Sequence, residues 1–135
     1  VPNDPTNLGR SLLLLQKQGL IKLKDNVGLN GTVLDIVDNP KQLKIVELEA
    51  AQLPRSLDDV DLAIINTTYA SQIDLLPTRD GLFVEDKDSP YVNLIVTREE
   101  NKDEEKVKKF VQAYQSDEVD KVATEVFKGG AVKGW

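Results

Sequence analysis

The chain has 135 residues, of which 40% are hydrophobic and 30% are charged, and its net charge is −6. This composition is typical of a folded globular chain of about one domain, and the acidic balance argues against a nucleic-acid partner, whose phosphates require concentrated Lys and Arg. The sequence contains no His, Cys or Met, which excludes the usual zinc ligands, thiol nucleophiles and Ser-His-Asp triads.

The hydropathy pattern and the start of the chain add a further expectation. Every apolar run is shorter than the roughly 18 residues needed to cross a bilayer. The sequence begins with Val1 rather than Met and carries no signal peptide, so we interpret it as part of a longer or processed protein.

The first nineteen residues predict a helix that is buried over much of its circumference. Asp4 is a suitable N-cap, Pro5 fits the first helical position, and Gly19 is a natural left-handed stop. The leucines between these signals recur at helical spacing and make an apolar stripe that is wider than a surface helix needs: Leu8, Leu12, Leu13, Leu14 and Leu15.

Arg10 departs from this apolar pattern. It follows Thr6 by four positions, so it lies on the same helix face, close to the free N–H groups and the positive dipole end of the helix. A helix N-terminus beside a guanidinium can receive a carboxylate or a phosphate. The alternative is a surface Arg whose alkyl stem lies over apolar neighbours.

Three apolar stretches further along predict strands. Residues 44–48 alternate and are β-branched in the middle, residues 61–65 form a continuous run typical of a buried parallel strand, and residues 91–97 are apolar on both faces. Short helices are predicted at 52–59 and 67–73. Strands that alternate with helices predict an α/β fold with a mostly parallel sheet.

The last third predicts two amphipathic helices. The first presents Val107, Phe110, Val111 and Tyr114 on one face after an acidic first turn. The second begins at Ser116 and is stopped by the glycines at 129–130.

Two asparagines are candidate ligand-binding residues. Asn66 directly follows one predicted strand, and Asn93 interrupts another. Ligands in open α/β sheets bind beyond the carboxyl ends of the strands, and a buried amide needs hydrogen-bond partners. The alternative is that each amide satisfies a nearby backbone group or turn.

Two acidic clusters, at 58–61 and 99–105, could supply a general acid–base pair or a Mg²⁺ site. The second cluster is interspersed with lysines and opens a helix, which is typical of a solvated face. We therefore predict no catalytic residue, no metal site and no cofactor.

Four long ungapped segments carry a family resemblance: PNDPTNLGRSLLLLQ, KIVELEAAQLPRSLDDVDLAIINTTYA, DSPYVNLIV and FKGGAVKGW. They closely resemble the methionine-binding lipoproteins of bacterial ABC importers, within the NlpA lipoprotein family. The resemblance implies an α/β fold of the periplasmic binding protein type (type II). Residues 1–90 would form most of the second lobe, and residues 91–135 would cross the hinge and return to the first lobe.

The resemblance also implies a ligand and roles for the three candidate residues. Arg10 matches the carboxylate-binding Arg of the family, and Asn66 and Asn93 match its two ligand-binding asparagines, whose oxygens accept from the ligand ammonium. The implied function is capture of methionine between two lobes and delivery to a permease and ATPase complex. The implied location is the periplasmic side of the bacterial inner membrane, through a lipid anchor.

The sequence lacks several parts of that family pattern: the signal peptide, the lipidated Cys and the N-terminal half of the first lobe. We therefore expect an incomplete cleft, and exposed apolar surface that favours oligomerisation. Two other functions remain open. One is a binding protein of the same family for another amino acid or a short peptide. The other is a metal-dependent acidic α/β enzyme domain that uses the cluster at 58–61.

Overall fold

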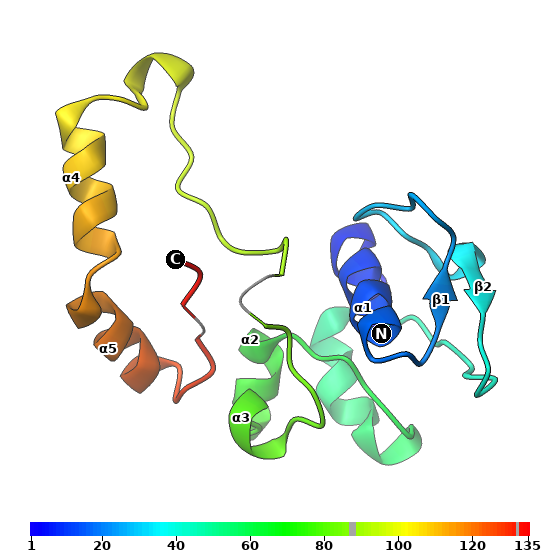
Figure 1. The fold of residues 1–135 in the computed structure, drawn as a ribbon. Coiled ribbons are helices and arrows are strands. Elements are labelled where there is room, and N and C mark those ends of the chain that lie inside the picture. The colour runs from blue at the N-terminus through cyan, green and yellow to red at the C-terminus, as the bar shows by residue number, and fades with distance from the viewer. Residues whose placement is uncertain (87–88, 132) are drawn as a thin grey trace. The chain divides into compact units, whose positions relative to one another are not determined.

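The computed structural model describes residues 1–86, 89–131 and 133–135. Contacts divide the chain into two compact units, Val1–Asp74 and Leu75–Trp135 (Figure 1). The predicted assignment of residues 1–90 and 91–135 to different lobes stays a prediction.

Helix α1 (Pro5–Lys17) forms as its capping signals predict. The Asp4 carboxylate accepts from the backbone N–H of Asn7 at 3.0 Å, and Pro5 occupies the first turn. At the other end Gly19 has a φ of 69°. There the N–H groups of Gly19 and Leu20 bond back to the carbonyls of Gln16 and Leu15 at 2.9 and 3.0 Å. This is the Schellman arrangement, which satisfies the last carbonyls of the helix.

The predicted leucine stripe supplies the core of the first unit. Most of the buried apolar side chains of this unit come from α1, from the segment that follows it and from residue 53: Leu8, Leu12, Leu15, Ile21, Leu23 and Leu53. Leu13 and Leu14 are half-buried, so the buried face is narrower than predicted. The Gln16 side chain accepts from the Leu23 N–H at 2.7 Å and ties α1 to the strand that follows.

The sheet of the first unit is small. Strand β1 (Lys22–Leu23) pairs antiparallel with β2 (Ile36–Asp38). A 3₁₀ turn, η1 (Val33–Asp35), leads into β2 and begins with a capping box between Thr32 and Asp35. Hydrogen bonds from the backbone and hydroxyl of Thr32, with a further one from Lys24, lower the pKa of the Asp35 carboxyl.

The three predicted strands are largely wrong. Residues 61–65 and 91–97, which all lie in the described part of the chain, form no strand. In 44–48, Leu48 alone makes an isolated parallel bridge, to Pro2, supported by the Asn3 N–H to Leu48 C=O bond of 2.8 Å. Within the described residues the one sheet is two-stranded and antiparallel, not mostly parallel. An apolar run predicts extended chain, but a strand also needs a neighbour to receive its hydrogen bonds.

Short helices complete the first unit near the predicted positions. η2 (Ala50–Asp59) is a 3₁₀ helix that contains Pro54, and its Leu53 is buried. α2 (Thr67–Ala70) is continued by the 3₁₀ turn η3 (Ser71–Ile73). Helix α2 contacts η2, and Ala70 lies in the interior.

The second unit is helical, as predicted for the last third of the chain. It contains α3 (Pro77–Asp80), η4 (Glu99–Asn101), α4 (Glu105–Tyr114) and α5 (Asp117–Val126). The Ser116 hydroxyl caps α5 by accepting from the Val119 N–H at 3.3 Å. Gly129 has a φ of 80° just beyond α5. Within the described residues, no helix combines the length and the apolar character that would let it span a bilayer.

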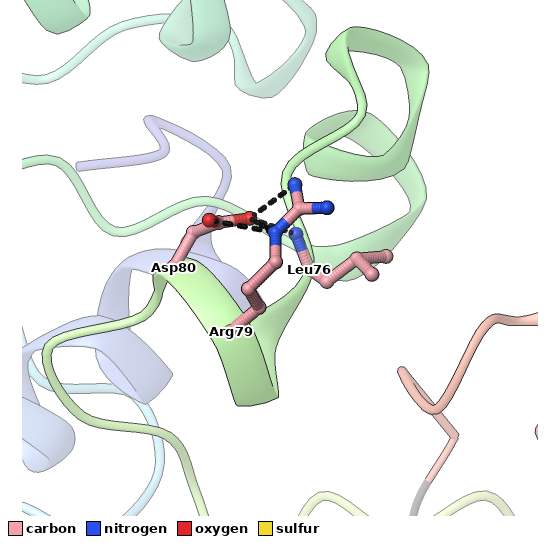
Figure 2. A network of polar contacts seen from close by, with 3 residues as sticks. All are labelled: Leu76, Arg79 and Asp80. Atoms are coloured by element: carbon pink, nitrogen blue, oxygen red, sulfur yellow. Dashed lines mark hydrogen bonds and ion pairs between the residues drawn. The ribbon is translucent and has the colours of Figure 1, made fainter.

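Helix α3, which the sequence did not predict, is a single turn closed by one carboxylate (Figure 2). Asp80 accepts from the backbone N–H of Leu76 at 2.8 Å and from Arg79 Nη2 at 2.8 Å. The Arg79 hydrogen bonds, followed by the Leu76 N–H, lower the pKa of Asp80. Because these groups are exposed to solvent, the contacts define the local turn rather than the stability of the unit.

Candidate functional site

The candidate site lies where the first turn of α1 meets the start of α2. Asn66 is the N-cap residue of α2, and its backbone carbonyl accepts from the N–H groups of Tyr69 and Ala70 at 2.9 and 3.0 Å. Its side chain does not cap the helix. Asn66 Nδ2 instead donates to Asn7 Oδ1 at 2.8 Å, a contact between residues 59 positions apart. The side chain of Asn66 therefore belongs to a tertiary contact with α1.

Asn7 links this contact to the helix cap. Its Nδ2 donates to both carboxylate oxygens of Asp4, at 3.1 and 3.0 Å. Hydrogen bonds from Asn7, first its backbone N–H and then its side chain, lower the pKa of Asp4 despite partial desolvation. Asp4 is thus an ionised acceptor at neutral pH, and Asn7 connects it to Asn66 through a continuous hydrogen-bonded chain.

The oxygen of the Asn66 side-chain amide has no hydrogen-bond donor among the described residues. This atom, Oδ1, is buried. A buried acceptor without a donor costs about 1–3 kcal/mol, and such an atom calls for an explanation. A donor supplied by a ligand would satisfy it.

Arg10 lies one turn along α1 from Asn7, the residue that contacts Asn66. It follows Asn7 by three positions on α1, so the two side chains are neighbours on the helix surface, and Arg10 is half-buried. The structure thereby brings Asn66 to the first turn of α1, one turn before Arg10 in the same helix. A guanidinium and an unsatisfied amide oxygen are together complementary to a group that carries both negative and positive charge.

Asn93, the third predicted site residue, belongs to the second unit, where it is exposed in a segment without regular secondary structure. The expectation that it interrupts a buried strand is wrong. Its predicted role in ligand binding stays a prediction.

Two surface cavities lie elsewhere. One, of about 600 Å³, is lined by Leu13, Gln16 and residues 21–29. The other, of about 440 Å³, lies in the second unit between Tyr114 and the apolar face of α5. Neither is lined by Arg10 or Asn66, so neither carries the chemistry of the candidate site.

The carboxylates of the two acidic clusters do not come together around a common point in the described residues. Among the described residues, no group of three or more carboxylates is arranged to hold a metal ion. The cluster at 58–61 lies at the end of η2, where Asp58, Asp59 and Asp61 are exposed. The metal-dependent enzyme hypothesis therefore has no supporting geometry in this part of the chain.

Comparison with known proteins gives similarity along the whole chain. The D-methionine-binding lipoprotein MetQ of Escherichia coli strain K12 is 80% identical over 137 residues, which cover all of this chain and 51% of that protein. A crystal structure of the methionine binding protein MetQ is 79% identical, with a TM-score of 0.78 over 100% of this chain and 56% of that one. A nutrient binding protein from Burkholderia cenocepacia, solved with methionine bound, is 56% identical, with a TM-score of 0.81 over 100% of this chain and 57% of that one.

These likenesses define the class of protein first. The fold is that of an α/β periplasmic binding protein, which confirms the predicted fold class, and the chain spans about half the length of the curated relatives it matches. A family model described as NlpA lipoprotein matches residues 1–135, and the chain belongs to that family.

Proposed function

We propose that this chain supplies part of a substrate-binding protein that captures methionine and delivers it to an ABC importer. The observation that carries the proposal is the buried, unsatisfied Asn66 Oδ1, which lies at the end of α1 that also presents Arg10. The names of relatives that are 80% and 79% identical support methionine as the ligand. The ligand is either the L or the D enantiomer.

The proposed roles follow from charge. The Arg10 guanidinium pairs with the ligand carboxylate through two parallel N–H···O bonds. Asn66 Oδ1 accepts from the ligand ammonium, which removes the cost of leaving that atom without a donor. Asn93 contributes a second amide oxygen to the ammonium when the lobes close over the ligand.

The family supports the remaining parts of the proposal. The partners are the permease and ATPase of an ABC transporter, and the location is the periplasmic side of the bacterial inner membrane. The membrane is contacted through a lipid anchor that lies outside this sequence. Binding and release involve no covalent chemistry, so the protein works without catalytic residues or a cofactor.

Calorimetric titration tests the proposal. The samples are this chain and a chimera in which its 135 residues replace the matching segment of the Escherichia coli relative. L-methionine, D-methionine, leucine and glutamine are titrated into each. We expect the chimera to bind one methionine per chain and to bind leucine and glutamine at least about tenfold more weakly, since one methylene or polar group changes binding by that order. Tight binding of leucine or glutamine without methionine binding would instead support a family member for another amino acid.

A further inference from the structure

We infer that Asp4 and Asn7 are positioning residues that fix the orientation of the Asn66 amide, so that its oxygen and not its NH₂ group is the end left for the ligand. The identity of the ligand group rests on the function proposed above. The orientation of the amide is a property of this chain alone. It is set by the one group in the network whose hydrogen-bonding character is fixed.

That group is the carboxylate of Asp4. An ionised carboxylate only accepts hydrogen bonds, whereas an Asn side chain has a donor end and an acceptor end of nearly equal shape. Both oxygens of Asp4 lie about 3 Å from the same atom of the Asn7 side chain. That atom must therefore be Nδ2, because an amide oxygen in its place would face two negatively charged oxygens.

The orientation of Asn7 then determines that of Asn66. With Nδ2 facing Asp4, the atom that Asn7 presents to Asn66 is its oxygen, and an oxygen can only accept. Asn66 must meet it with Nδ2, as the 2.8 Å contact shows. Asn66 Oδ1 is left as the buried atom without a partner among the described residues. The Asp4 carboxylate thus determines, through the Asn7 amide, that the end of Asn66 left for a ligand is an oxygen, which accepts hydrogen bonds.

This arrangement selects the chemistry of the ligand group. A free Oδ1 accepts from an ammonium and repels a carboxylate, whereas a free Nδ2 would do the opposite. The first turn of α1 therefore orients an acceptor for the ammonium, while Arg10 on the same helix supplies a cation for the carboxylate. Residues in the first two turns of α1 therefore determine where the ammonium and where the carboxylate of an amino acid would bind.

Asp4→Asn tests the inference without removing the helix cap, since Asn and Asp are equally good N-cap residues. The new amide at position 4 can then place an NH₂ group where a carboxylate oxygen was. Asn7 is expected to turn its oxygen toward that donor and its NH₂ toward Asn66, which reverses the Asn66 amide. The double variant Asp4→Asn/Asn7→Asp restores an acceptor-only group next to Asn66 and is expected to return its amide to the original orientation.

The readout is the exchange of the Asn66 side-chain NH₂ protons with water, measured by NMR on the 135-residue chain without ligand. In the original chain one of these protons is bonded to Asn7 and exchanges slowly. We expect Asp4→Asn to raise the exchange rate about tenfold, because one hydrogen bond changes the ratio of the two amide orientations by about that factor. We expect the double variant to restore the original rate. Asp25→Asn, which removes an exposed carboxylate elsewhere in the same unit, is the matched control.

Equal exchange rates in all four proteins would overturn the inference, as would failure of the double variant to restore slow exchange while its backbone spectrum remains folded. A second arm places each variant in the chimera and follows its Asn66 signal during addition of L-methionine or its analogue without the amino group. We expect Asp4→Asn to weaken methionine binding about tenfold more than binding of the analogue, because only methionine carries the ammonium. If methionine perturbs none of these chimeras, the proposed function fails, and the exchange rates of the 135-residue chain still decide the orientation of the amide.

Discussion

Gly9→Ala is expected to destabilise the first unit by about 2 kcal/mol or more, although alanine is the best helix former. Gly9 lies in α1, where the helix packs against the backbone of the segment before η1. A Cβ atom at this position would overlap the carbonyl oxygen of Leu29 and lie 3.0 Å from its carbonyl carbon and 3.3 Å from the Gly31 nitrogen. Backbone atoms cannot move aside as a flexible side chain can, so the helix or the loop must shift.

Chemical denaturation, followed by circular dichroism, measures this effect. Thr6→Ala is the matched control, because Thr6 is exposed in the same helix, and we expect it to be neutral or slightly stabilising. A Gly9→Ala variant as stable as the original chain would show that α1 and the 29–31 segment are not packed backbone to backbone.

Arg10→Ala is expected to weaken methionine binding by about 2 kcal/mol or more, which is roughly a 30-fold rise in Kd. The substitution removes the cation proposed to hold the ligand carboxylate and leaves that charge without a partner in a partly desolvated site. Alanine is tolerated well in a helix, so the loss of affinity should not be accompanied by unfolding. Arg10→Lys should give an intermediate Kd, since an ammonium keeps the charge but not the two-pronged geometry.

The measurement is a methionine titration of the chimera that carries each substitution. Lys17→Ala is the control, because it removes the same unit charge from the exposed end of the same helix, and its Kd should be unchanged. If Arg10→Ala and Lys17→Ala bind methionine equally well, Arg10 returns to the alternative of a surface residue whose stem covers apolar neighbours.

The sequence predicts those elements whose determining residues act on neighbouring backbone groups, and it fails where an element depends on a distant partner. Helix α1 was predicted to within two residues because Asp4, Pro5 and Gly19 act through neighbouring backbone groups. The strands at 61–65 and 91–97 were predicted from apolar runs and are wrong, since pairing depends on a neighbouring strand that a local pattern cannot reveal. The close approach of α1 to the loop at residue 29 was invisible for the same reason.

Local sequence patterns identify two of the candidate site residues, whose roles in ligand binding stay predictions. Arg10 and Asn66 are candidates because they follow a helix start and an apolar run, and a contact from Asn66 to Asn7 joins the start of α2 to the first turn of α1. Asn7 was missed, because a polar residue in a first helical turn is ordinarily explained by capping. One signal was present: Asn7 occupies the third helical position after the Asp4 cap, where Glu or Gln usually closes a capping box. That its oxygen meets Asn66, 59 residues away, could be found only in the folded chain.

In the proposed function, Arg10 on α1 and the Asn66 oxygen that has no partner in the described residues together hold the two charged ends of one amino acid. A crystal structure of the chimera grown with L-methionine tests it most directly. We expect the ligand carboxylate to pair with the Arg10 guanidinium and the ligand ammonium to lie about 3 Å from Asn66 Oδ1, within hydrogen-bond distance. Methionine bound away from both residues, or with its carboxylate facing Asn66 Oδ1, would show that these two residues do not hold the ligand as proposed.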